Sequence, residues 1–162
     1  MAFLSCLLPV VVMFGFLLSS YAYLVERRFA RARELGQVYR AYCDVGVFSC
    51  TRVFSSEYGS LTQFVGLPHV SNAVLGMIFY LSELATCRFP TLLLFMSAAS
   101  CVVSVGLFLI LTLILHDLCI VCGSIYVVNF VTCLGAWKLR RQKMAPPHTR
   151  RRRRRRGKGK KH

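Results

Sequence analysis

Two cysteines separated by two residues carry the clearest chemical signal in this sequence. Cys119 and Cys122 form a Cys-x-x-Cys motif at the predicted start of an apolar helix. This spacing places both sulfurs on one helix face, and the dipole and free N–H groups of a helix N-terminus favour the thiolate of the first cysteine. A thiolate attacks disulfides and other electrophiles. Asp117, the predicted N-cap, opposes the effect of the dipole, so the motif predicts a redox-active thiol pair without fixing its pKa.

A second pair, Cys43 and Cys50, lies earlier in the chain with six residues between the two cysteines. A loop of this length closes easily, so a disulfide is feasible there. Two pairs in one oxidising compartment suggest a relay, in which electrons pass from an external dithiol to the first pair and then to the Cys-x-x-Cys pair. The other four cysteines are scattered in apolar runs, where a free cysteine packs as a small apolar residue: Cys6, Cys87, Cys101 and Cys133.

Two other interpretations of the cysteines remain open. The Cys-x-x-Cys motif can be incidental packing in an apolar helix, or the four paired cysteines can bind zinc. The flanking residues are apolar and no histidine pattern accompanies them, so we expect no metal site.

Polar residues continue the face that carries the motif. Tyr126 and Asn129 follow Cys122 by four and seven residues, so they point roughly the same way as the thiols. A polar stripe on an apolar helix faces the bundle interior, where it either forms interhelical hydrogen bonds or lines a pocket. Asn72, at the start of an earlier helix, either caps that helix or reaches the mouth of the same pocket. Thiols among apolar walls at membrane depth suit a lipid-soluble redox partner, and a quinone is the obvious class.

The elements that must position these residues are four long apolar runs. Apolar residues make up 56% of the 162-residue chain, and a transmembrane helix needs about 20 mostly apolar residues. The first run is longer than the core of a signal peptide and no basic residue precedes it, so we expect a membrane helix there. The sequence thus predicts an all-α integral membrane protein, a four-transmembrane-helix bundle. Its predicted spans are Phe3–Leu24, Val70–Cys87, Pro90–Leu115 and Leu118–Trp137.

The basic residues predict the topology. Of the 21 Lys and Arg, 14 lie in residues 138–162, and cytoplasmic ends of membrane proteins collect such residues. Four crossings then place both termini in the cytosol, and residues 25–69 form a luminal cap of a multi-pass protein in the endoplasmic reticulum membrane. The lysines near the C-terminus resemble a dilysine retrieval signal, which supports this compartment. The predicted domains are a membrane redox domain, residues 1–140, and a disordered basic tail, residues 141–162. The tail suits anionic lipid head groups, and without interleaved aromatic residues we expect no nucleic-acid binding.

Several motifs in one order carry a family resemblance. They cover roughly residues 20–140, and they are Tyr39–Gly46 (YRAYCDVG), Ser49–Ser56 (SCTRVFSS), Asn72 with Gly76, Phe79 with Tyr80, and Asp117–Cys122 (DLCIVC) with Tyr126. This set closely resembles the vitamin K epoxide reductase family. The resemblance implies a four-helix bundle around a quinone pocket, topped by the luminal cap.

The resemblance also implies roles for the four paired cysteines. Cys122 attacks vitamin K epoxide or quinone, and Cys119 resolves the adduct by forming a disulfide. Cys50 passes electrons to Cys119, and Cys43 exchanges with a thioredoxin-like luminal thiol oxidoreductase.

Three further residues would contact the substrate. Asn72 and Tyr126 would hydrogen-bond its two oxygens, and Phe54 would pack near the naphthoquinone ring. Coumarin anticoagulants such as warfarin would occupy the same pocket. No tightly bound cofactor is implied beyond the redox-active disulfides. The chain departs from the family pattern in shorter cap loops, in Tyr58 where tryptophan is expected, and in the arginine run of the tail.

Three functions fit this sequence. The first is reduction of vitamin K 2,3-epoxide to the quinone, and of the quinone to the hydroquinone. The second is a quinone-linked disulfide-forming enzyme that supports oxidative protein folding. The third is a non-catalytic membrane scaffold held by its basic tail.

Overall fold

The computed structural model describes residues 2–44, 49–56 and 70–144, and within these ranges it forms helices and no strand. The side chains of residues 2–4, 54 and 55 are not among the described parts. The helices follow one another as α1 (Ala2–Glu34), α2 (Cys50–Ser55), α3 (Asn72–Thr86), α4 (Pro90–Leu109), a π-helical turn η3 (Ile110–Ile114) and α5 (Ile120–Met144).

Three helices in the described ranges are long and apolar enough to cross a membrane. They are α1 from Ser5 onward, α4 together with η3, and α5. Helix α3 is apolar but has 15 residues, a length of about 22 Å against a hydrocarbon core of about 30 Å. The prediction of an all-helical fold is therefore confirmed for the described residues, and three of the helices can cross a membrane, whereas the count of four spans and the luminal cap stay predictions.

Helix α1 continues well beyond its apolar run. Its last turns carry charged residues, including Arg31 and Arg33 near the negative end of the helix dipole. The helix ends where Gly36 adopts a positive φ of 65°. The Gly36 N–H donates to Arg33 O, and the Gln37 N–H donates to Ala32 O. This is a Schellman arrangement, in which glycine takes the left-handed position without steric cost.

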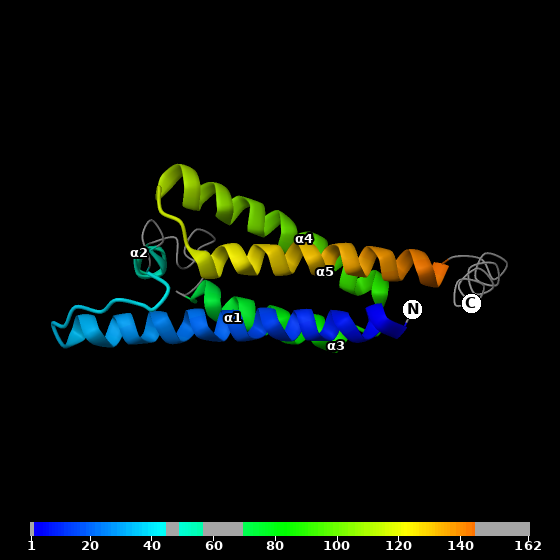
Figure 1. Cartoon of the computed structure of the whole chain (residues 1–162), viewed down its shortest axis with the longest axis horizontal. Helices are drawn as coiled ribbons and strands as arrows, with labels where there is room; N and C mark the ends of the chain where they lie inside the picture. The colour runs from blue at the N-terminus through cyan, green and yellow to red at the C-terminus, as the bar shows by residue number, and fades with distance from the viewer. Residues whose placement is uncertain (1, 45–48, 57–69, 145–162) are drawn as a thin grey trace, which may run out of the picture.

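The bundle is held mainly by contacts of α1 with α3 and α5, and of α4 with α5. Small residues bring α1 and α3 close together, since a Cβ at Gly76 would lie 2.7 Å from the hydroxyl oxygen of Ser19. Figure 1 shows that α1 begins and α5 ends at the same end of the bundle, and that α2 lies near the opposite end. The short helix that carries Cys50 is thereby placed beside the start of α5.

The connection from α4 to α5 differs from the prediction. The predicted span Pro90–Leu115 loses its regular α-helix at Ile110, and His116 with a positive φ of 52° turns the chain. Asp117 was predicted to cap α5, and this was wrong. Cys119 is the N-cap, because its carbonyl accepts the Gly123 N–H at 2.9 Å and its sulfur accepts the Cys122 N–H at 3.4 Å.

The predicted start of α3 and the predicted end of the membrane domain also differ from the structure. Ser71 rather than Asn72 caps α3, since its hydroxyl accepts the Ala73 N–H at 3.1 Å. Helix α5 continues to Met144, four residues past the predicted domain boundary at 140. Arg141 and Lys143 in its last turn are good helix formers and favour the negative end of the dipole. The rest of the predicted tail, residues 145–162, lies outside the described residues.

Candidate functional site

Helix α2 brings the first cysteine pair to the second. Ser49 caps α2, and its own N–H donates to the carbonyl of Leu118 at 2.8 Å, just before α5. This bond ties the α2 segment to the start of α5. As a result the sulfurs of Cys50 and Cys119 lie 3.2 Å apart, and both residues are buried. The structure therefore places in contact the two cysteines between which the resemblance implies electron transfer, although their roles stay proposals.

Asp44 joins the turn of Cys43 to the same helix. Its carboxylate accepts the Ala41 N–H at 3.1 Å, the Thr51 N–H at 3.0 Å and the Thr51 hydroxyl. The Cys43 sulfur, one Asp44 oxygen and the Cys50 sulfur lie within 4.8 Å of one another. The sequence interpretation gave Asp44 no role. Its position beside Cys43, before a helix that Cys50 begins, was the available signal.

The environment of this cluster keeps its thiols neutral. The hydrogen bond with Cys119 and then burial raise the pKa of Cys50. Burial and then the hydrogen bond with Cys50 raise the pKa of Cys43 to about 12. Burial also acts to raise the pKa of Asp44, but the hydrogen bonds from Thr51 and Ala41 outweigh it and hold that pKa below its usual value. The reduced cluster thus pairs neutral thiols with an ionised carboxylate at neutral pH.

A cavity of about 500 Å³ lies beside Cys122, between α1, α3, α4 and α5. Cys122, Tyr126 and Asn129 line it from α5, and Asn72 lines it from the start of α3. Most of the remaining wall is apolar, with side chains such as Leu75, Phe79, Val103, Leu107, Leu111 and Ile125. The predicted stripe on α5 therefore borders an apolar cavity, as a pocket for a lipid-soluble molecule requires.

Hydrogen bonds also connect the helices at the wall of this cavity. The Tyr80 hydroxyl donates to the Asn129 side-chain carbonyl at 2.7 Å, and the Asn129 amide donates to the Ser104 hydroxyl at 2.8 Å. Both interpretations of Asn129 thus hold, since it lines the cavity and joins α3, α4 and α5.

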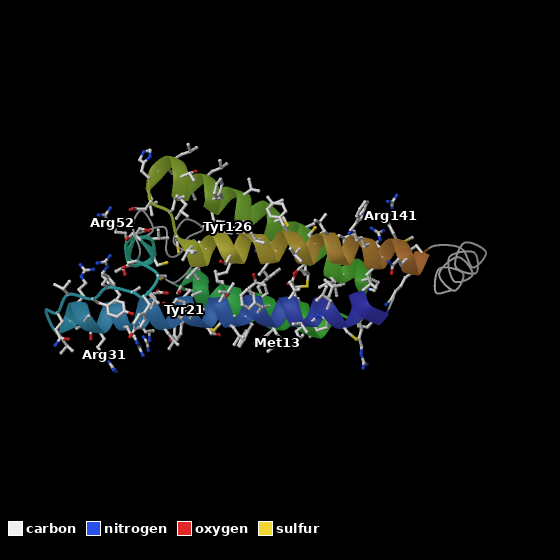
Figure 2. All side chains as sticks on the ribbon, viewed as in Figure 1. Met13, Tyr21, Arg31, Arg52, Tyr126 and Arg141 are labelled. Atoms are coloured by element: carbon white, nitrogen blue, oxygen red, sulfur yellow. The ribbon has the colours of Figure 1, made fainter. Side chains whose placement is uncertain are left out.

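The structure describes the side chain of Tyr126 but not that of Phe54. The ring of Tyr126 meets Phe108 edge to face, with centroids 6.3 Å apart. In the described part of the chain no hydrogen bond involves its hydroxyl, which leaves that group available to a ligand. Figure 2 shows Tyr126 on α5 and Tyr21 on α1, in the half of the bundle nearer α2. Phe54 lies in α2, but its side chain is outside the described parts, so its substrate contact stays a prediction.

Two acidic residues in the interior were not assigned a role from the sequence. Glu26 lines the cavity and accepts a hydrogen bond from the Ser71 hydroxyl, which joins α1 to the start of α3. Glu83 is fully buried, and neither of its carboxylate oxygens has a hydrogen-bond partner among the described residues. A single acid within an otherwise apolar run was the available signal for Glu83.

Comparisons with known proteins agree with this arrangement. The vitamin K epoxide reductase family model matches residues 6–137. The chain is 40% identical over 147 residues to vitamin K epoxide reductase complex subunit 1 of Mus musculus, covering 83% of this chain and 86% of the mouse protein. It is also 40% identical over 128 residues to the protein of that name from Rattus norvegicus, covering 71% and 77% of the two chains. This chain therefore belongs to the vitamin K epoxide reductase family.

Proposed function

We propose that this protein is a membrane thiol-dependent reductase that converts vitamin K 2,3-epoxide to the quinone and the quinone to the hydroquinone. One observation carries the proposal. Cys122 borders an apolar cavity, and the other cysteine of its motif, Cys119, contacts Cys50 outside that cavity. A route of thiols thus leads from the segment between α1 and α3 to a site suited to a lipid-soluble quinone. The names of the mouse and rat relatives support the choice of substrate.

The proposed chemistry uses the Cys-x-x-Cys pair as a two-electron donor. The Cys122 thiolate attacks the substrate, and the Cys119 thiol then displaces it by forming the Cys119–Cys122 disulfide. The dithiol loses two electrons and two protons. In the first reaction these reduce the epoxide to the quinone and its oxygen leaves as water. In the second they reduce the quinone to the hydroquinone.

Two thiol–disulfide exchanges regenerate the dithiol. Cys50 attacks Cys119, which forms a Cys50–Cys119 disulfide and releases Cys122 as a thiol. Cys43 then attacks Cys50, which releases Cys119 and leaves a Cys43–Cys50 disulfide. A thioredoxin-like luminal dithiol reduces this last bond and is itself oxidised. The contact between the sulfurs of Cys50 and Cys119 supports the first exchange.

The cavity walls support an orientation for the substrate. Asn72 and Tyr126 come from different helices and line the same cavity as Cys122. We propose that they hydrogen-bond the two quinone oxygens, that Phe54 packs on the ring, and that coumarin anticoagulants compete for this space. The proposed setting is the endoplasmic reticulum membrane, with both termini in the cytosol.

The first experiment measures vitamin K epoxide reduction in membranes that contain the wild-type chain or Cys122→Ala, with dithiothreitol as electron donor. Activity should be present in the wild type and absent in Cys122→Ala. Cys6→Ala is the matched control, because Cys6 is exposed on α1 and does not line the cavity, so its activity should equal the wild-type value. Full activity of Cys122→Ala would contradict the proposal.

The reversibility of thiol exchange favours one other function. The same thiols can oxidise luminal proteins and pass the electrons to a quinone, which makes the protein a disulfide-forming enzyme. Oxidative folding of a secreted reporter, measured with and without this chain, separates the two directions. A non-catalytic scaffold would instead keep its cellular role after loss of Cys119 and Cys122.

A further inference from the structure

The cluster beside α2 contains three groups that also bind metal ions. The Cys43 sulfur, an Asp44 carboxylate oxygen and the Cys50 sulfur all lie within 4.8 Å of one another. The Cys119 sulfur lies 3.2 Å from that of Cys50. The group of candidate ligands is therefore two sulfurs and one carboxylate, and the Cys119 sulfur lies next to one of them.

We infer that the reduced cluster is a binding site for a thiophilic divalent cation of the Zn²⁺ class, with Cys43, Asp44 and Cys50 as its protein ligands. Zinc accepts thiolate and carboxylate ligands in a tetrahedron. With metal–sulfur bonds of about 2.3 Å and metal–oxygen bonds of about 2.1 Å, two ligands of one zinc lie about 3.6–3.8 Å apart. The three ligand atoms all lie within 4.8 Å of one another, so small side-chain movements bring them to this spacing.

The surroundings of Asp44 resemble the outer shell of a metal site. Hydrogen bonds from Ala41 and Thr51 fix its carboxylate and keep it ionised. Such outer contacts orient the ligands of metal sites and raise their affinity. Arg40, which donates to the Asp44 backbone carbonyl at 3.0 Å, opposes a cation nearby. The negative charge of the bound thiolates and carboxylate must outweigh that repulsion.

Burial supports the same ligand set. Cys50 is buried, whereas Cys43 is partly exposed and offers an entry for the ion. The two thiols of Cys43 and Cys50 are neutral in the reduced protein, so binding must release their protons. The sequence analysis expected no metal site because the cysteines have apolar flanks and no histidine pattern, and it did not consider Asp44 as a ligand beside Cys43 and Cys50.

Metal binding and disulfide formation exclude each other at this site. A cysteine in a disulfide has no thiolate to offer, so only the reduced cluster binds the ion. A bound ion holds the thiolates of Cys43 and Cys50 and stops their exchange reactions. By stopping this exchange, the bound ion should inhibit the proposed reductase. This inhibition rests on the proposed function, whereas the binding of the ion does not.

The test uses the full chain in detergent, reduced, freed of reductant under anaerobic conditions and titrated with Co²⁺. We expect one equivalent of Co²⁺ to bind with a thiolate-to-cobalt charge-transfer band, which Zn²⁺ then removes by displacement. The oxidised wild-type protein should show no band, and this contrast does not depend on any variant folding. Cys43→Ser with Cys50→Ser should abolish the band, and Asp44→Asn should weaken Co²⁺ binding at least tenfold.

Cys6→Ala is again the control, because it removes a cysteine outside the cluster and should leave Co²⁺ binding unchanged. Helical circular dichroism of each variant shows whether the bundle is intact. Absence of the band in the reduced wild type overturns the inference, and so does a band of unchanged affinity in the Cys43→Ser, Cys50→Ser protein. If wild-type membranes do not reduce vitamin K epoxide but Co²⁺ binds as described, the proposed function fails and the metal site stands.

Discussion

The sulfurs of Cys50 and Cys119 lie 3.2 Å apart, although 69 positions separate the two residues in the chain. Both are buried, and a backbone hydrogen bond from Ser49 to Leu118 holds their segments together. This contact links the segment between α1 and α3 to the helix that borders the cavity.

The contact predicts a specific disulfide. In a Cys43→Ala, Cys122→Ala protein, Cys50 and Cys119 lose their other exchange partners, so mild oxidation should join them. Mass spectrometry after non-reducing proteolysis should show a Cys50–Cys119 peptide pair in most molecules. The same protein with Cys119→Ser added should lack a bridge to Cys50. If Cys50 remains alkylatable in the oxidised double variant, the two sulfurs are not neighbours in the membrane.

The raised pKa of Cys43 predicts an unusual dependence of its reactivity on pH. Its pKa is raised from 9.0 to about 12 by burial and by the hydrogen bond with Cys50, and only the thiolate reacts with iodoacetamide. The Cys43 alkylation rate in the reduced protein should therefore still rise about tenfold per pH unit between pH 9 and 11. An unfolded peptide with the same sequence should level off near pH 9. A plateau near pH 9 in the folded protein would show that the cluster does not hold this thiol neutral.

The same shift has a consequence for stability. Because the folded pKa of Cys43 lies above the unfolded value, the folded state retains its proton more strongly. The associated stabilisation is fully present below pH 9 and is lost as the pH rises from 9 to about 12. The melting temperature of the reduced wild type should fall across this window more steeply than that of Cys43→Ala.

Glu83 should reduce the stability of the bundle. It is fully buried, with both carboxylate oxygens unpaired among the described residues, and an unsatisfied buried polar group typically costs about 1–3 kcal/mol. Glu83→Leu should raise the free energy of unfolding in detergent by an amount of this order. Glu34→Leu is the control, because Glu34 is exposed at the end of α1 and its change should stay within about 0.5 kcal/mol. A destabilised Glu83→Leu protein would mean that the carboxyl group has a partner.

Two glycines should respond in opposite ways to an added methyl group. A Cβ at Gly15 would lie 2.9 Å from the Tyr80 hydroxyl oxygen and closer still to two of its ring carbons. Tyr80 is buried and hydrogen-bonded to Asn129, so Gly15→Ala should lower the free energy of unfolding by about 1–3 kcal/mol.

Gly106, in α4, is the matched control, because a Cβ there has no described neighbour within 4 Å. Gly106→Ala should be neutral or stabilise by up to about 1 kcal/mol, as alanine favours the helix. Thermal unfolding of both variants in detergent checks the pair. Equal melting temperatures would contradict the close packing of α1 against α3.

The sequence by itself determined the all-helical architecture of the described residues and the long apolar helices that can cross a membrane. Long apolar runs specify helices because the backbone must satisfy its hydrogen bonds within each segment in lipid. The spacing of Cys122 and Tyr126 places both on the face of α5 that lines the cavity, because helical periodicity depends only on nearby residues. The same local pattern put Asn129 on the wall of the cavity.

Only the tertiary structure decided which distant groups meet. The Cys50–Cys119 contact, the anchoring of Asp44 and the burial of Glu83 without a described partner all depend on how α2, α3 and α5 pack. The N-cap of α5 also differs from the predicted one. Asp117 forms an ion pair with Arg52 at 3.4 Å, and Cys119 occupies the capping position. Contacts between residues far apart in the chain leave no local pattern, because side-chain packing across helices selects them.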